Sequence, residues 1–290
     1  FPSRMLDSYI DSVLTGATSD GKVWGLPDTA GFHLLLFYNA DLIQKPPDTE
    51  TEMQALAQLL QGDDEAGLVV NSQDPIWLLP WVWAYGSWIV DDQGQAQLES
   101  EAMTKALSLY LQWHNSKPPV APLLSHVEAR DQFMNGQAAL MIDGEWAIAE
   151  LTQHNDISWK VAPLPDITDA ERSPAPLILG RYWAINTDLP TKKAKTAITF
   201  LETVTAPQRQ IEWLRVFGVL PTQRAALGGQ INADNPALQI SLQQLQNGQG
   251  VPLHTNLNAI LDAMRTPLRQ MLAGNLTPEE AATLMQDTFR

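Results

Sequence analysis

Residues 133–146 read FMNGQAALMIDGEW, and this stretch limits the fold that the chain can form. The short apolar run at residues 138–142 is typical of a buried strand, and Asp143-Gly144 is a turn signal directly after it. Upstream, Ser125 and Glu128 have the spacing of a helix capping box. The stretch therefore predicts a helix followed by a buried strand.

The same alternation of strand and helix signals continues along the chain in both directions. Further strands are predicted at residues 23–27, 34–38, 68–71, 160–162 and 182–186. Further helices are predicted at residues 49–60, from 74, 100–114, 194–204, 207–217 and from 277, with Gly218 as a left-handed C-cap. This alternation favours an α/β architecture, and a chain of 290 residues usually divides into two domains.

Composition excludes several classes of partner and chemistry. The formal net charge of −15 argues against nucleic acid and anionic membrane surfaces as partners. Without cysteine the chain has no disulfide, no thiolate catalysis and no cysteine-ligated metal. The histidines lack metal-ligand spacing, and no nucleophile turn or phosphate loop is present. We therefore predict no catalytic residue, no metal and no cofactor, although a glycosidase-like pair of carboxylates would converge in space rather than in sequence.

Tryptophan is concentrated in one segment. Trp77, Trp81, Trp83 and Trp88 fall within twelve residues, and on a helix Trp77, Trp81 and Trp88 would share one face. Such a face is either a platform on which sugar rings stack or simply part of the core. We expect Trp81 and Trp88 to lie in the core. Trp77, in the first turn after Asp74, is compatible with either role.

Five segments in order carry a resemblance to a known family. They are DGKVWGLP at 20–27, LFYNADL at 36–42, the stretch at 133–146, WAIN at 183–186 and GVLPT at 218–222. Together they resemble the maltose-binding-protein-like members of extracellular solute-binding protein family 1, which serve sugar-type ABC transporters. The resemblance implies a periplasmic-binding-protein-like α/β fold, with two lobes that close over a ligand in the cleft between them.

The resemblance also implies a domain division. Family members begin with strand–helix units that precede the segment similar to residues 20–27, whereas here that segment comes almost at once. We therefore expect residues 1–33 and 181–232 to form a remnant of lobe 1, and residues 34–180 and 233–290 to form a complete lobe 2. A partial lobe 1 would pair with a separate N-terminal fragment or self-associate through that lobe.

Four ligand-binding residues follow from matching motifs in the expected second lobe. Trp146 resembles the sugar-stacking tryptophan of the family's G-x-W block, with a buried packing indole as the alternative. Asp74 resembles an acidic ligand-binding residue, and it is also a natural helix N-cap. Trp77 substitutes for an aromatic residue that Ile76 replaces, and Arg265 resembles a C-terminal arginine that reaches the cleft.

Residues near the expected hinge complete the candidate site. Arg181, Tyr182 and Asp28 lie where the chain would cross the hinge, as ligand contacts or hinge braces. His33 is interpreted as a hydrogen-bonded structural histidine. Leu261 stands where the family has a tryptophan, which argues against a maltodextrin-like ligand.

The function predicted from the sequence is capture of a small ligand, a mono- or oligosaccharide, for delivery to ABC transporter permease subunits. The expected location is periplasmic or extracellular, with lipid anchoring of the full-length form left open. Two alternatives remain: a glycoside-acting enzyme, and a ligand-sensing domain built on the same fold.

Overall fold

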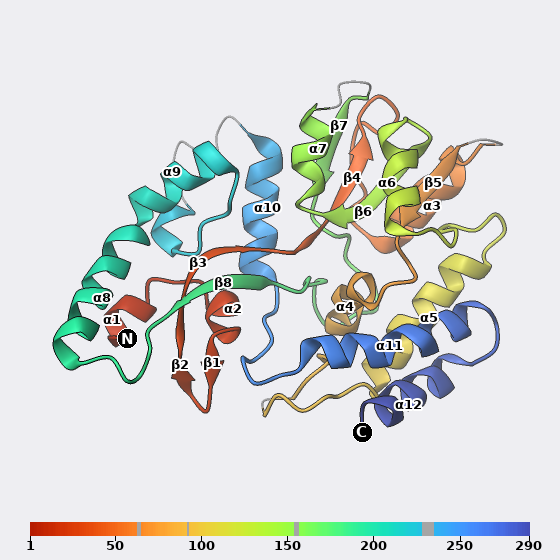
Figure 1. Cartoon of the computed structure of the whole chain (residues 1–290). Coiled ribbons are helices and arrows are strands. Elements are labelled where there is room, and N and C mark those ends of the chain that lie inside the picture. The colour runs from red at the N-terminus through yellow and green to blue at the C-terminus, as the bar shows by residue number, and fades with distance from the viewer. Residues whose placement is uncertain (63–64, 92, 154–156, 228–234) are drawn as a thin grey trace. The chain divides into compact units, whose positions relative to one another are not determined.

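The structure is a computed structural model that describes residues 1–62, 65–91, 93–153, 157–227 and 235–290. The chain divides into two compact units, each assembled from two separate stretches (Figure 1). Unit 1 contains Phe1–His33 and Leu177–Thr255, and unit 2 contains Leu34–Pro176 and Asn256–Arg290.

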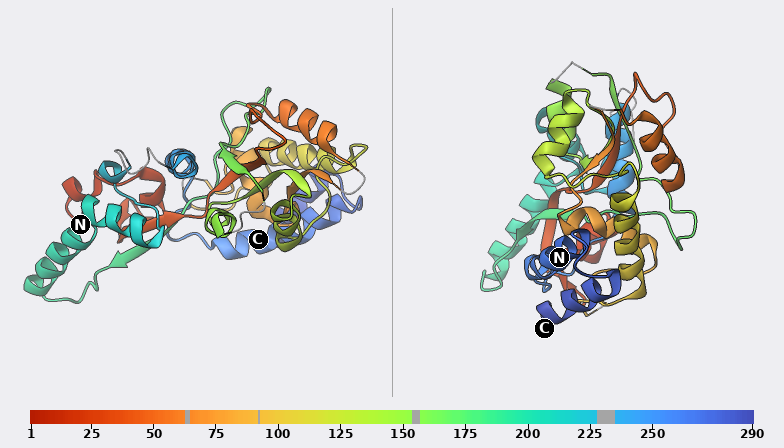
Figure 2. Two further views of the ribbon diagram at one scale, coloured as in Figure 1. Left: turned by 90° about the horizontal axis from the view of Figure 1, so that it is seen from above. Right: turned by 90° about the vertical axis from the view of Figure 1, so that its right-hand side faces the viewer.

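Unit 2 is built around a four-stranded mixed sheet in the order β5-β6-β4-β7. Strand β4 (Leu34–Asn39) pairs antiparallel with β6 (Ala138–Gly144) and β7 (Trp159–Ala162), and β5 (Ala66–Val70) pairs parallel with β6. Every residue of β4 and β6 is buried, which fits their continuous apolar runs. Helices α3 (Glu50–Leu60) and α6 (His126–Met134) cover opposite faces of this sheet (Figure 2).

Local capping signals set where the helices of unit 2 begin. Asp74 accepts a hydrogen bond from the Ile76 backbone and starts α4 (Pro75–Ala84). The predicted capping boxes form completely at α6 and at α12 (Pro278–Phe289): the cap side chain accepts from the backbone N–H of the glutamate, and the glutamate side chain accepts from the backbone N–H of the cap residue. At α3 the box is modified, because Glu52 accepts from the backbone N–H of Asp48 while Thr49 still caps the helix.

The helical layer of unit 2 corrects one prediction about the tryptophans. Trp81 is fully buried and packs edge-on against Trp113 of α5 (Glu101–Asn115), as expected for core. Trp88 does not share its helix face: α4 ends at Ala84, and Gly86 follows with a φ of 103°. Trp88 is half-buried and packs against Trp83 instead.

Unit 1 contains a two-stranded antiparallel sheet, β3 (Gly25–Gly31) with β8 (Leu179–Ala184). Its remaining elements are α1 (Ser3–Leu6), α2 (Asp11–Thr15), β1 (Thr18–Ser19), β2 (Lys22–Val23), α8 (Thr191–Val204), α9 (Pro207–Phe217), η1 (Arg224–Ala226) and α10 (Pro236–Asn247). Gly218 ends α9 in the left-handed region, as predicted.

The two units differ from the expected lobes at residues 177–180 and 233–255. Leu242 and Leu245 of α10 pack in one cluster with Ile10 and Val13, so the described part of residues 233–255 belongs with the N-terminal segment. The boundary expected at residue 232 lies outside the described residues.

Two further helices belong to unit 2, the short α7 (Ala147–Gln153) and the long α11 (Leu257–Leu272). Among the described residues, no helix has both the length and the apolar character needed to cross a bilayer.

Candidate functional site

A buried carboxylate and a histidine form the polar centre of the candidate site in unit 2. Asp143 lies opposite Leu35 near the end of β6 and is only 1% exposed. His126, the first residue of α6, places Nε2 2.9 Å and 3.0 Å from the two carboxylate oxygens of Asp143. The hydrogen bond with Asp143 raises the pKa of His126 above its usual value, against the opposing effect of burial.

Two tryptophans pack against this histidine. The Trp77 ring lies 5.4 Å from the His126 ring and donates its indole N–H to the Ile142 carbonyl at 2.9 Å. Trp146, directly after β6, is edge-on to Trp77 with ring centroids 6.3 Å apart. Trp77 is almost completely buried, whereas Trp146 is half-buried, so Trp146 has more surface available to a ligand.

The hydrogen-bond roles within the cluster follow from the carboxylate. Trp146 Nε1 lies 3.4 Å from His126 Nε2, but the same Nε2 is 2.9 Å from Asp143 Oδ1. A nitrogen this close to a carboxylate carries the proton and donates it, so it has no lone pair for the indole N–H. We therefore interpret the contact between Trp146 and His126 as packing.

An ion pair lies at the start of α4 in the same unit. One Asp74 oxygen accepts from the Ile76 backbone at 3.0 Å, and the other lies 3.6 Å from Arg265 Nε on α11. Arg265 also pairs with Asp262 of its own helix. The side chains of Asp74 and Arg265 are partly exposed, and Trp77 follows Asp74 by one helical turn. Unit 2 thus brings Asp74, Arg265, Trp77 and Trp146 into a single part of the fold.

The other predicted site residues lie in unit 1. Arg181 Nε donates to both oxygens of buried Asp28, at 3.0 and 3.3 Å, and the arginine side chain is 70% exposed. Tyr182 faces the interior: its hydroxyl donates to the Val13 carbonyl at 2.8 Å, and burial raises its pKa to about 12. The structure places Tyr182 as a brace between β8 and α2, with its hydroxyl already engaged.

His33 is the structural histidine that the sequence predicted. It is fully buried, and Nε2 lies 2.8 Å from Ser241 Oγ of α10. Burial lowers its pKa to about 3, so the imidazole is neutral in the folded protein. His33 therefore forms a hydrogen bond within the core of unit 1.

Sequence reasoning missed His126 and Asp143 as site residues. A signal for each was present, since the capping box fixes His126 at the first position of α6, and Asp143 is the last residue but one of β6. Their pairing joins two elements across 17 positions of sequence and depends on packing. Within the described ranges, no cluster of three or more metal-ligating side chains is present.

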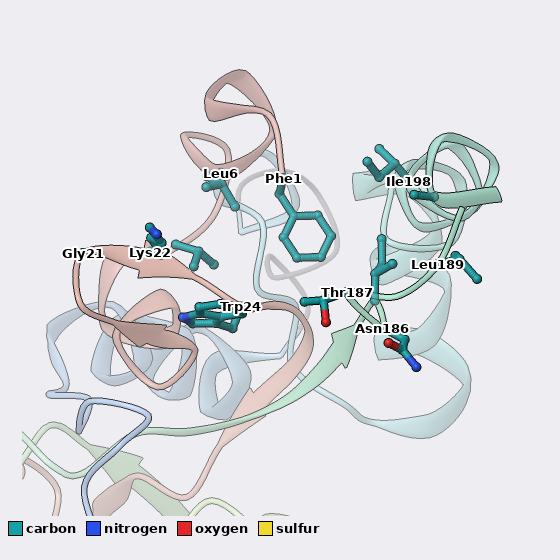
Figure 3. Close-up of a pocket in the computed structure, with 12 residues that line it drawn as sticks. Phe1, Leu6, Gly21, Lys22, Trp24, Asn186, Thr187, Leu189 and Ile198 are labelled. Atoms are coloured by element: carbon teal, nitrogen blue, oxygen red, sulfur yellow. The ribbon is translucent and has the colours of Figure 1, made fainter. Parts of the chain in front are cut away.

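Unit 1 has a separate hollow of about 540 Å³ that none of the predicted site residues lines. Figure 3 shows Phe1 and Trp24 lying next to one another, with Leu189 and Ile198 on the opposite side. The lining is mostly apolar, and Lys22 supplies its charged group. This hollow has neither the paired charges nor the buried carboxylate of the unit 2 cluster.

Two related sequences share extended similarity with this chain. Maltodextrin-binding protein MdxE of Bacillus subtilis is 24% identical over 209 residues, which cover 67% of this chain and 49% of that protein. The maltooligosaccharide ABC transporter solute-binding lipoprotein of Streptococcus pneumoniae R6 is 21% identical, over 98% of this chain and 69% of that protein. The chain therefore spans about half the length of the first relative.

Two solved structures have the same fold. The maltose/maltodextrin-binding domain MalE from Bdellovibrio bacteriovorus, bound to maltotriose, gives a TM-score of 0.79 at 26% identity, over 99% of this chain and 76% of that one. A cyclo/maltodextrin-binding protein complexed with maltotetraose gives 0.89 at 20% identity, over 100% and 75%. Residues 4–239 match the family described as bacterial extracellular solute-binding protein. Because that match covers most of the chain, this protein is a member of the bacterial extracellular solute-binding protein family.

Proposed function

We propose that this protein binds a neutral mono- or oligosaccharide for an ABC transporter, outside the cytoplasmic membrane, and that Trp146, Trp77, Asp74 and Arg265 contact the ligand. The observation that carries the proposal is the half-buried Trp146 indole, edge-on to Trp77 in the unit that holds the Asp74–Arg265 pair. A sugar ring has flat C–H faces that pack on an indole, and hydroxyls that need polar partners.

The named relatives support the sugar class but leave its length open. Both sequence relatives and the 26%-identical structure are maltodextrin or maltooligosaccharide binders. In this chain, Leu261 is a buried residue of α11 and contributes no aromatic surface. We therefore expect fewer stacking contacts than a site with tryptophan there would have, which favours a short saccharide.

Unit 1 holds the other candidate residues that the sequence predicted. Arg181 keeps an exposed guanidinium whose Nε is fixed by Asp28. An arginine held in this way has its remaining N–H donors oriented at little entropic cost. We propose that Asp28 positions the Arg181 guanidinium, and that Tyr182 braces β8, the strand that carries Arg181.

Binding without turnover is part of the proposal. Asp74 caps α4 and pairs with Arg265, and Asp143 is buried against His126. Neither carboxylate is arranged as a general acid that could reach a leaving-group oxygen. Incubation with maltotriose, followed by chromatography of the sugars, should recover the trisaccharide intact. Release of glucose or maltose would favour the glycoside-acting alternative.

The test of the proposal is a maltotriose and glucose titration of the protein that contains this chain. Trp146→Ala should weaken binding about thirtyfold, the equivalent of roughly 2 kcal/mol for a stacking residue. Trp88→Ala is the matched control, because Trp88 forms a similar edge-on pair with Trp83, 6.1 Å apart, in the same unit. Equal losses in the two variants, or no loss in either, would contradict the assignment of Trp146.

We further propose two polypeptide partners: the permease subunits of the transporter, and a segment that covers one face of unit 1. Among the described residues β8 pairs with β3 alone, so its second edge has no strand partner. Leu179 and Trp183 of β8 and Phe200 of α8 are exposed, and Trp183 and Phe200 pack edge-on at 6.3 Å. An open strand edge beside exposed aromatics favours a segment that adds a strand.

The occupant that we favour for this face is a strand-adding segment supplied separately, with self-association of unit 1 as the alternative outcome. About a quarter of each solved neighbour's chain lies outside its match to this protein, so each of those proteins has further chain beyond the shared part. The apolar hollow lined by Phe1, Trp24 and Ile198 lies in the same unit and would take apolar side chains from such a segment.

A further inference from the structure

The Asp143–His126 pair lies beneath the two indoles of the candidate site. Asp143 is at a fully buried strand position, and His126 provides its one side-chain partner among the described residues. The Gly144 backbone N–H also donates to it, at 2.8 Å. A buried carboxylate is costly unless it is paired, so this histidine has an electrostatic role as well as a packing role.

The geometry defines what each nitrogen of His126 can do. Nε2 carries the proton that is donated to Asp143. No hydrogen bond to Nδ1 occurs within the described part of the chain, and the side chain is 31% exposed. Nδ1 of the neutral ring is an acceptor, and Nδ1 of the protonated ring is a donor. The pair can thus offer a ligand hydroxyl either kind of partner, according to pH.

We propose that His126 contacts the bound sugar, that Asp143 is its positioning residue, and that the pair makes sugar affinity depend on pH. This inference rests on the proposed function and adds a residue and a regulatory property to the same site. The ring already packs against Trp77 and Trp146, at 5.4 and 6.1 Å between centroids. A sugar stacked on Trp146 would therefore lie within reach of the histidine.

The direction of the pH effect follows from desolvation. A ligand that covers the partly exposed His126 displaces the water that screens the buried Asp143 carboxylate, and an anion without a full counter-charge then becomes more costly. Protonation of His126 completes the counter-charge and turns Nδ1 into a charged donor for a sugar hydroxyl oxygen. The protonated form should bind more tightly, so affinity should fall as pH rises through the histidine pKa. Ligand binding should raise that pKa in return.

Other charged groups around the ring leave this direction unchanged. Arg130, on the same helix, lowers the pKa of His126, and Glu150 of α7 raises it. Arg130 and Glu150 form an ion pair with each other at 2.8 Å, which reduces the net field of either group at the ring. The hydrogen bond that His126 donates to Asp143 is the largest influence, and it raises the pKa of His126 above its usual value.

The experiment is a maltotriose titration of the protein that contains this chain, between about pH 5 and about pH 9, the range in which histidines titrate. The expected loss of affinity from the acidic to the basic end is about fivefold, or about 1 kcal/mol. His126→Gln keeps an N–H donor for Asp143 but cannot titrate, so its affinity should be independent of pH in this range. Asp143→Asn should move the step to lower pH.

Histidine C–H resonances give a second readout that a purely structural role would not change. The His126 signal, identified by its loss in His126→Gln, should titrate at a higher pH with maltotriose bound than without it. His126→Asn also keeps an N–H donor without titrating, and it serves if the glutamine variant fails to fold. A pH step that persists in either variant, or a resonance unmoved by ligand, would overturn the inference.

The same experiments distinguish failure of the proposed function from failure of this inference. If no sugar binds at any pH from a panel of neutral mono- and oligosaccharides that includes maltotriose and glucose, both the function and this inference are wrong. If Trp146→Ala abolishes maltotriose binding while His126→Gln matches the parent protein throughout the pH series, the function stands and this inference alone is wrong.

Discussion

The backbone of Gly144 and the indole of Trp146 are in direct contact. A methyl group built on Gly144 would lie 2.2 Å from the Cη2 atom of the Trp146 ring and nearly as close to its two neighbours. Contact at that distance requires the ring or the strand to move. The last residue of β6 therefore fixes where the indole lies, because only a glycine leaves the space that the ring occupies.

Gly144→Ala should displace the Trp146 ring and weaken maltotriose binding about tenfold, or about 1.4 kcal/mol. The change can be measured by titration, with indole fluorescence reporting the altered surroundings of the ring. Gly62→Ala is the control, because the nearest neighbour of its new methyl group is a flexible glutamate side chain at 3.2 Å. Unaltered affinity in Gly144→Ala would mean that the ring position is irrelevant to binding.

Substitutions of Asp74 should separate its capping role from its ligand role. Asp74→Ala removes the N-cap of α4 and should cost about 1 kcal/mol of stability. Asp74→Asn retains an oxygen that accepts from the Ile76 backbone but removes the charge that faces Arg265. We expect Asn to restore the unfolding temperature but not the sugar affinity. If Asp74→Asn restored the sugar affinity as well as the stability, Asp74 would act only as the N-cap of α4 and would have no ligand role.

The sequence predicted those parts of the fold that local chemistry controls. The Asp74-Pro75 start of α4 and the capping box of Ser125 and Glu128 each involve residues within one turn of helix. The prediction that Trp81 and Trp88 share a helix face was wrong because it assumed one continuous helix. In the structure α4 ends at Ala84, and Gly86 then has a positive φ. Where a helix ends can thus depend on the backbone conformation of a single residue, which the pattern of apolar residues does not indicate.

Pairings between distant segments were beyond local reasoning. The α10 helix packs its Leu242 and Leu245 on Ile10 and Val13, more than two hundred positions away, and this moved residues 235–255 into unit 1. The Asp143–His126 pair of the candidate site arises in the same way, from a strand end and a helix start. Patterns in one segment carry no information about which other segment will lie against it.

His33 should make stability depend on pH on the acidic side. The folded state holds its pKa at about 3, whereas an unfolded histidine titrates near 6.5. As pH falls below about 6.5, the unfolded state binds a proton that the folded state does not, and stability decreases. The contribution is fully present above that pH and is lost down to about pH 3, by at most about 1.4 kcal/mol per unit.

The measurement is the denaturant midpoint against pH for the parent protein and for His33→Gln. The glutamine amide can still bond to Ser241 but does not titrate, so the acidic loss of stability should be shallower in the variant. If the denaturant midpoint fell equally steeply with decreasing pH in the parent protein and in His33→Gln, His33 would be taking up a proton in the folded state, in conflict with its burial.

The exposed aromatic face of unit 1 should determine how the 290-residue chain associates. Trp183 and Phe200 are exposed beside an edge of β8 that has no strand partner within the described part of the chain. Light scattering should therefore give a mass above that of one chain, or mass spectrometry should find a bound second fragment. The double variant Trp183→Lys with Phe200→Lys should abolish either association, because charged side chains on an edge oppose strand addition. Leu59→Lys, at a more exposed apolar position on α3, should leave it intact. A monodisperse single chain that binds maltotriose as tightly as the double variant does would show that this face needs no partner.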